Sequence, residues 1–209
     1  MNGIVPPELE AYMDGLLPQR DPVLIEIETL AANRGIPIVG PAVGRVLFLL
    51  ARVINARQVF EMGSAVGYST IWLARGVGEK GVVYYTDTEQ ENARQAVSYF
   101  KKAGVDNQVR LLIGDSINLI DTVEEDFDLI FNDVDKKQYP EAFVKAYPRL
   151  RRGGLLVSDN VLWYGRVAEG NRGTATEAVR EFNRLIYSKE DLFTTILPIR
   201  DGISISLRL

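Results

Sequence analysis

Short apolar runs alternate with amphipathic segments over most of the chain, from Gln58 onward. Apolar runs of about five residues between turn residues are typical of buried strands, whereas apolar positions repeating every three or four residues indicate helices. Their alternation predicts βαβ units and a parallel sheet with helices on both faces. The predicted strands span residues 59–62, 82–86, 109–113, 127–131 and 154–158, and the predicted helices span 68–75, 90–103, 139–150 and 174–187, with a short helix after Asp115.

Both ends of the chain depart from this alternation. The apolar runs 193–197 and 203–207 are separated by too few residues for a parallel crossover, so the last strand should run antiparallel. Near the N-terminus, Asp21 and Pro22 signal a helix that Gly35 ends, and a second apolar helix is predicted over 46–54. We expect one doubly wound α/β domain over residues 1–209 with seven strands, in which 1–56 form a helical extension and 57–209 form the core.

Two residue types are missing from the 209-residue chain, which has no cysteine and no histidine. This excludes disulfides, zinc sites built on these residues, the Ser-His-Asp triad and any imidazole base. The other totals, 46% hydrophobic and 25% charged residues, are ordinary for a globular protein. Any chemistry must therefore come from carboxylates, amides, lysine, hydroxyls, or a bound cofactor or metal.

The charge and hydropathy of the chain predict its cellular location and whether it binds membranes or nucleic acid. No run of about 18 uncharged apolar residues occurs, and the first residues, Met1 to Pro6, lack the pattern of a signal peptide, so we expect a cytoplasmic protein without a membrane span. The net charge of −4 gives no general attraction to nucleic acid or anionic lipid. The basic cluster at 149–152 is expected to cap the C-terminal end of a helix. We therefore expect no nucleic-acid partner.

The turn after the first predicted strand is a candidate nucleotide-type site, because ligands bind beyond the carboxyl ends of strands in doubly wound sheets. It reads Glu61-Met62-Gly63-Ser64-Ala65-Val66-Gly67 and lacks the Gly-x-Gly-x-x-Gly pattern that a pyrophosphate needs. An adenosyl ligand without phosphate suits it better, which points to S-adenosylmethionine rather than NAD. Asp87, at the end of the second strand, is well spaced to accept hydrogen bonds from ribose hydroxyls, although a helix N-cap is an equal reading.

Oxygen ligands follow the fourth and fifth predicted strands. Asp133, Asp159 and Asn160 form the set preferred by magnesium, manganese or calcium. Lys136 follows three residues after Asp133, and a lysine beside a cation and an oxygen substrate can act as a base. Each residue alone has a plain alternative, a cap or turn for the aspartates and a surface position for the lysine. Their joint occurrence at the strand ends favours a site.

Together these motifs resemble the metal-dependent, S-adenosylmethionine-dependent O-methyltransferases typified by catechol and caffeoyl-CoA O-methyltransferases, in particular their small bacterial members. The resemblance covers residues 37–209. It is carried by the turn at 61–69, Asp87, the run 127–136, the segment 153–165 and Asp201-Gly202. It implies a Rossmann-like class I methyltransferase fold, a hydroxylated, aromatic small-molecule acceptor and a homodimer.

The resemblance also implies residue roles. Glu61, Gly63, Ser64, Ser69, Asp87, Ser116 and Asp133 would bind the cofactor; Asp133, Asp159 and Asn160 would bind a divalent cation, magnesium first; Lys136 would be the general base, and Trp163 would lie near the acceptor. Asn132, Val134, Tyr164 and Arg200 depart from the residues common in the family. Because segment 37–45 also departs from the family pattern near the acceptor, we expect an unusual substrate.

Two other functions stay open at this point. An NAD-dependent oxidoreductase on a related sheet is favoured only by the glycine turn and Asp87. A cofactor-binding protein without catalysis is disfavoured by the presence of Lys136 and all three candidate metal ligands.

Overall fold

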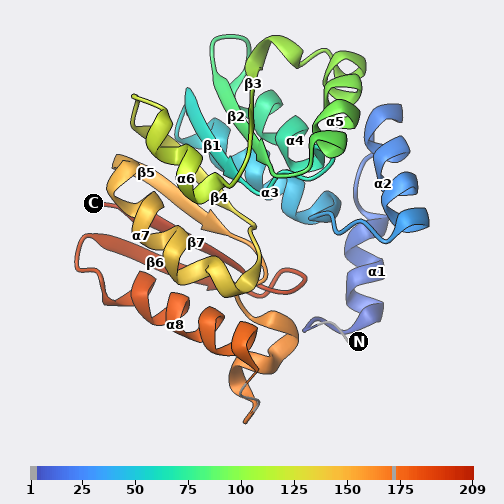
Figure 1. The fold of residues 1–209 in the computed structure, drawn as a ribbon. Helices are drawn as coiled ribbons and strands as arrows, with labels where there is room; N and C mark the ends of the chain where they lie inside the picture. Colours follow the sequence, from blue (N-terminus) through green and yellow to red (C-terminus); the bar gives the residue numbers. More distant parts are fainter. Residues whose placement is uncertain (1–3, 171–172) are drawn as a thin grey trace.

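The computed structural model describes residues 4–170 and 173–209, and in this part of the chain a seven-stranded sheet forms the centre of the molecule (Figure 1). The strand order is β3-β2-β1-β4-β5-β7-β6. The strands are β1 (Gln58–Met62), β2 (Val82–Asp87), β3 (Val109–Ile113), β4 (Phe127–Asn132), β5 (Leu150–Ser158), β6 (Leu192–Leu197) and β7 (Ile203–Arg208). β7 pairs antiparallel with both β5 and β6, whereas β1 to β5 pair in parallel. The predicted mostly parallel sheet with a reversed last strand is confirmed.

Helices cover both faces of this sheet, as predicted. The helices are α1 (Pro7–Gly15), which has no buried residue and joins neither core cluster, α2 (Pro22–Arg34), α3 (Gly40–Val53), α4 (Tyr68–Val77), α5 (Gln90–Ala103), α6 (Ser116–Leu119), α7 (Tyr139–Arg149) and α8 (Thr174–Ser188). Short 3-10 turns η1 to η4 lie at 106–108, 120–122, 136–138 and 163–168. Successive strand residues point to opposite faces. Val59 accordingly packs in the cluster formed with α2 to α5, and Phe60 in the cluster formed with α6 to α8.

The helix α2 begins and ends as its sequence signals predict. The Asp21 carboxylate accepts a hydrogen bond from Leu24 N at 3.0 Å, Pro22 occupies the first turn, and Gly35 ends the helix in the left-handed conformation with φ of 68°. The next helix, α3, begins at Gly40, earlier than the predicted residue 46, because Pro41 is well suited to a first helical turn. The segment between α2 and α3 is therefore short.

β5 is longer than predicted. The glycine pair Gly153-Gly154 was expected to mark its start, but the strand runs from Leu150, and its register with β4 shifts between Phe127 and Leu129. Gly153 has φ of 74°, a conformation that glycine adopts without strain. The glycines thus form an irregularity inside the strand instead of a boundary.

Of the basic cluster at 149–152, Arg149 lies in the last turn of α7, as expected, but its guanidinium forms its hydrogen bonds outside that helix. The Arg149 guanidinium donates to the carbonyls of Ile120, Val123 and Glu125, which belong to the segment before β4. Arg151 forms an ion pair with Asp128. Arg149 and Arg151 therefore connect segments of the fold that lie apart in the sequence.

No helix in residues 4–170 or 173–209 has the length and apolar character that crossing a bilayer requires. Of the N-terminal segment considered for a signal peptide, Met1 to Gly3 lie outside the described residues.

Candidate functional site

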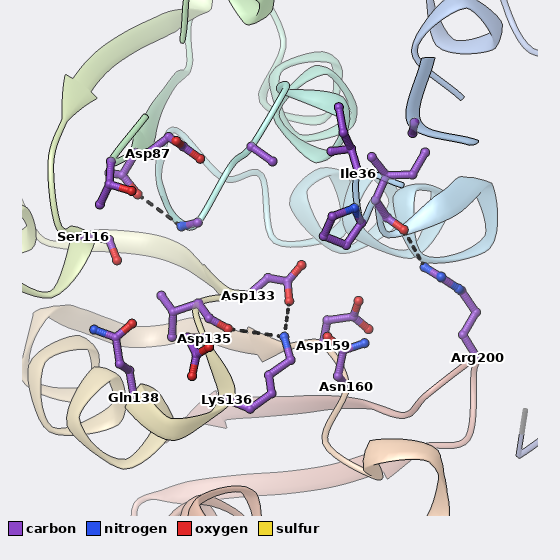
Figure 2. Close-up of a pocket in the computed structure, with 18 of the residues that line it drawn as sticks. Ile36, Asp87, Ser116, Asp133, Asp135, Lys136, Gln138, Asp159, Asn160 and Arg200 are labelled. Carbon is purple, nitrogen blue, oxygen red and sulfur yellow. Dashed lines mark hydrogen bonds and ion pairs between the residues drawn. The ribbon is translucent and has the colours of Figure 1, made fainter. Parts of the chain in front are cut away.

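A cavity of about 930 Å³ opens at the carboxyl ends of the parallel strands (Figure 2). Its walls come from the turns after β1 to β5, from α2 with the segment that follows it, and from the connection between β6 and β7. A site at this edge is what the doubly wound topology predicts. Its lining includes a glycine turn, polar and charged side chains, and two aromatic rings: Gly63, Asp87, Ser116, Asp133, Lys136, Asp159, Asn160, Trp163, Tyr164 and Arg200.

The turn after β1 brings bare backbone to the cavity. Gly63 has φ of 84°, and a Cβ atom there would lie 2.7 Å from the carbonyl oxygen of Asp133. Ser64, which is buried, ties the turn to β2, since its N–H donates to Thr86 O at 2.8 Å and its Oγ accepts from Thr86 N at 3.1 Å. Only glycine fits at position 63, and the turn is held rigidly for a ligand that approaches its backbone.

Glu61 and Ser69 lie beneath this turn. Both are buried, and the Glu61 carboxylate accepts a hydrogen bond from the Thr70 hydroxyl. Burial raises the pKa of Glu61 to about 7, although the hydroxyls of Ser69, Thr70 and Ser64 act to lower it. Glu61, Ser64 and Ser69 are not among the residues that line the cavity, so their roles in cofactor binding stay predictions.

Asp87 and Ser116 line the same cavity, at the ends of the neighbouring strands β2 and β3. Asp87 Oδ1 accepts from Glu89 N at 2.7 Å and from Asn92 Nδ2 at 3.1 Å, so the side chain is oriented by the start of α5. Ser116 opens α6 directly after Asp115, whose carboxylate caps that helix. The helix-cap reading is therefore correct for Asp115 and wrong for Asp87, since Glu89 is the N-cap of α5 and Asp87 lines the cavity.

The three candidate metal ligands come together at the ends of β4 and β5 (Figure 2). Asp159 is 2% exposed, and its Oδ1 has no hydrogen-bond partner among the described residues. Burial is the main cause that raises the pKa of Asp159 to about 7, and the negative charge of Asp133 is the second. Two neighbouring carboxylates with an unpartnered buried oxygen fit a divalent cation. Among the described residues, no three acidic, histidine or cysteine side chains lie close enough together to bind one metal ion. A third protein ligand would therefore have to be the Asn160 amide.

Lys136 lies next to this carboxylate pair. Its Nζ is 2.6 Å from Asp133 Oδ1 and 3.3 Å from Val134 O, and it sits 5.1 Å from the centre of the Tyr139 ring. The Tyr139 hydroxyl in turn donates to Asp159 O at 2.8 Å. The surface reading of Lys136 is thus wrong, because its side chain is only 13% exposed and lines the cavity.

The four departures from the family pattern surround the site. Asn132 is buried below the carboxylates, with Nδ2 3.4 Å from Ser158 Oγ, and Val134 lines the cavity. Tyr164, at φ of 56°, donates its backbone N–H to the Asp201 carboxylate. Arg200, at φ of 51°, also lines the cavity.

Glu28 is a lining residue that the sequence reasoning missed. It accepts hydrogen bonds from the Tyr68 hydroxyl at 2.6 Å and from Arg20 Nε at 2.9 Å. A signal was present, because Glu28 lies four residues after Leu24 and three before Ala31, on the buried stripe of α2. A charged residue on such a stripe indicates a site.

Sequence comparison identifies the family. A family model described as O-methyltransferase matches residues 21–209. A catechol O-methyltransferase from Niastella koreensis is 31% identical, and the match covers 99% of each chain.

Solved structures agree with this assignment. The O-methyltransferase TomG from Streptomyces achromogenes, in complex with SAM, has a TM-score of 0.88 and 29% identity, with 96% of each chain covered. An O-methyltransferase from Bacillus cereus in complex with SAH has a TM-score of 0.88 and 29% identity, with 97% of each chain covered. These findings decide against the NAD-dependent oxidoreductase. The chain belongs to the family of S-adenosylmethionine-dependent O-methyltransferases.

Proposed function

We propose that this enzyme methylates a hydroxyl of a catechol-like or other vicinal-dihydroxy small molecule with the help of a divalent cation. The observation that carries the proposal is the pair of buried Asp159 and half-buried Asp133, with Lys136 beside it in the cavity. Asn160 would complete the ligand set. Magnesium is the first candidate, and manganese or calcium would suit the same oxygen ligands. The similarity to a catechol O-methyltransferase supports the substrate class.

S-adenosylmethionine would lie across the turn after β1. The bare backbone at Gly63 supports a close approach by the ligand, and Asp87 and Ser116 offer polar groups for the ribose and adenine. Glu61, Ser64 and Ser69 would contribute to cofactor binding from beneath this turn. Asp133 would lie close to both the cofactor and the metal.

In the proposed reaction, the chain positions the acceptor hydroxyl between Lys136 and the methyl donor. A bound cation lowers the pKa of a hydroxyl that it contacts. Lys136 Nζ, as the neutral amine, takes the hydroxyl proton and becomes an ammonium group. The oxygen forms a bond to the methyl carbon, and the carbon–sulfur bond breaks with its electron pair going to sulfur. Positioning of this kind can supply about 7–11 kcal/mol of the barrier.

The test is methyl transfer to catechol, followed as formation of S-adenosylhomocysteine. We expect dialysis against EDTA to abolish activity and magnesium to restore it, and Lys136→Ala to lower kcat by about 100-fold or more, the usual contribution of a general base. Lys137→Ala is the matched control, because Lys137 is exposed and lies outside the lining residues.

Activity that survived both EDTA and Lys136→Ala would rule out this mechanism. Binding of S-adenosylhomocysteine without turnover of any phenolic or catechol acceptor would instead favour the non-catalytic alternative. Stabilisation of the fold by S-adenosylhomocysteine, read as a rise in Tm, separates loss of catalysis from loss of cofactor binding.

We also propose a homodimer in the cytoplasm. Support for the dimer comes from α1, which has no buried residue and exposes apolar side chains.

A further inference from the structure

Arg200 faces the proposed acceptor region from the side opposite the general base. It lies on the connection between β6 and β7, and its guanidinium reaches toward the segment that follows α2 (Figure 2). Figure 2 shows Asp159 and Asn160 between Lys136 and Arg200. An acceptor whose hydroxyls lie over the carboxylate pair would therefore extend toward Arg200.

The fold holds Arg200 in place at an energetic cost. Its φ of 51° lies in the left-handed region, which is unfavourable for a residue with a Cβ atom. The flanking backbone is fixed, because Asp201 O accepts from Leu162 N and Gly202 O accepts from Val161 N, both at 3.0 Å. Arg200 Nη1 donates to Ile38 O at 3.0 Å. Strained residues that the surrounding structure over-determines cluster at ligand sites.

The charge of Arg200 has no acidic partner in an ion pair among the described residues. Lys136, the other basic side chain that lines the cavity, lies 2.6 Å from Asp133 Oδ1, whereas Arg200 donates to the neutral carbonyl of Ile38. A guanidinium carries five N–H donors in a planar fork that matches a carboxylate. The charge of Arg200 acts on Asp133, Asp159 and Asp201 without forming an ion pair with them, so Arg200 retains donors for a ligand.

The wall near Arg200 suits an aromatic body. Trp163 and Tyr164 line the cavity with ring centres 5.6 Å apart, and Ile36 and Ile38 contribute apolar surface from the segment after α2. The cavity therefore combines the oxygen atoms of Asp133 and Asp159, apolar and aromatic walls, and the positively charged Arg200.

We propose that Arg200 binds a carboxylate of the acceptor, so that the substrate class is a vicinal-dihydroxy aromatic acid. This inference rests on the proposed function and narrows it. Arg200 would act in recognition and touch only the carboxylate, not the atoms of the bond that forms. Removing such a contact weakens binding equally in the ground and transition states, which raises KM and leaves kcat unchanged.

The experiment compares 3,4-dihydroxybenzoate and 3,4-dihydroxycinnamate with their methyl esters, which keep the diol and lose the charge. We expect kcat/KM for at least one acid to exceed that for its ester by tenfold or more. Arg200→Met should lower kcat/KM for that acid by about 10- to 100-fold through KM and change the ester by less than threefold, with Arg200→Lys in between. Arg152→Met, an exposed arginine at the start of β5, is the matched control.

An unchanged acid-to-ester ratio in Arg200→Met would overturn the inference and leave the proposed function intact. Methylation of neither acid nor ester by the wild type would instead count against the proposed function. In that case, calorimetry measures the Kd of 3,4-dihydroxybenzoate for the wild type and for Arg200→Met, in the presence of S-adenosylhomocysteine and magnesium. Tighter binding to the wild type than to Arg200→Met supports the inference, and equal or absent binding overturns it.

Discussion

Glu61 is a buried acid whose proton equilibrium links the site to the stability of the fold. It is fully buried, and burial raises its pKa from an ordinary value of 4.5 to about 7. The charge of Asp133 acts in the same direction, while the hydroxyls of Ser69, Thr70 and Ser64 oppose it. The folded protein therefore holds this proton more tightly than the unfolded chain.

Glu61→Gln is expected to change the pH dependence of stability. A folded pKa above the unfolded one gives stability that is complete below pH 4.5 and is lost as pH rises to about 7. At roughly 1.4 kcal/mol per pKa unit, the loss is about 3 kcal/mol. Urea unfolding of the cofactor-free protein between pH 4.5 and 8 should show this slope in the wild type and in the exposed control Glu181→Gln. Glu61→Gln should show a smaller slope, because the contribution of Asp159, whose pKa burial also raises to about 7, remains. Equal slopes in all three proteins would contradict the argument.

At the scale of elements, Asp128 joins three parallel strands at the edge opposite the cavity. Its Oδ2 accepts from Arg57 N at 2.6 Å and from Gln58 N at 2.8 Å, at the start of β1, and its Oδ1 pairs with Arg151 of β5. Burial acts to raise the pKa of Asp128, but the Arg151 guanidinium and the two backbone amides hold it below its ordinary value. The carboxylate is therefore stabilising in its charged form.

Asp128→Asn should destabilise the fold by about 2 kcal/mol, the scale of charge-assisted hydrogen bonds. Because the folded pKa is lowered, this stabilisation is present above an ordinary pKa of 3.8 and is lost as pH falls further, so the wild type and the variant should converge in acid. Chemical unfolding at pH 7 and pH 3 measures both effects. Asp126→Asn, whose side chain is 63% exposed, is the control. A drop in kcat without a loss of stability would show that Asp128 acts on the site instead.

Element boundaries were predictable wherever the chain carries local signals. Asp21 and Gly35 mark the ends of α2, and the short link from β6 to β7 requires their antiparallel pairing. The start of β5 was not predictable, since Gly153 and Gly154 read as a boundary, and pairing with β4 carries the strand through them. A glycine pair is compatible with a turn or with an irregular strand, and only the neighbouring strand decides.

At the scale of the whole molecule, the sequence predicts the part of the site that lies at strand ends. Asp87, Asp133 and Asp159 follow strands, and parallel topology brings them to one edge. Arg200 and Glu28 come from the last hairpin and from α2, and their approach depends on contacts between segments far apart in the chain, such as Arg200 with Ile38. Shared packing of α2 and α3 with the sheet supports the proposal of one domain over residues 1–209.

The helix α1 is the surface through which we propose that two copies of the chain associate. It is nine residues long and has no buried residue, although helices shorter than about 12–15 residues are marginal without packing. Its apolar side chains Leu9, Tyr12 and Met13, with Leu16 just after it, follow the spacing of a single stripe and are 44–66% exposed. A second copy of the chain would cover this stripe through a self-complementary contact around a two-fold axis.

We therefore expect the wild type to be a dimer and the double variant Tyr12→Glu, Leu16→Glu to be a monomer of 23.4 kDa per chain. Burying either glutamate in an apolar interface would leave a charge without water or a partner. Light scattering after size-exclusion chromatography measures the mass over a range of concentrations. Glu8→Gln and Glu10→Gln, on the same helix, are the controls. A dimer that persists in the double variant would move the interface to another surface, such as the exposed Leu49 and Val53 of α3, and a monomeric wild type would reject the dimer.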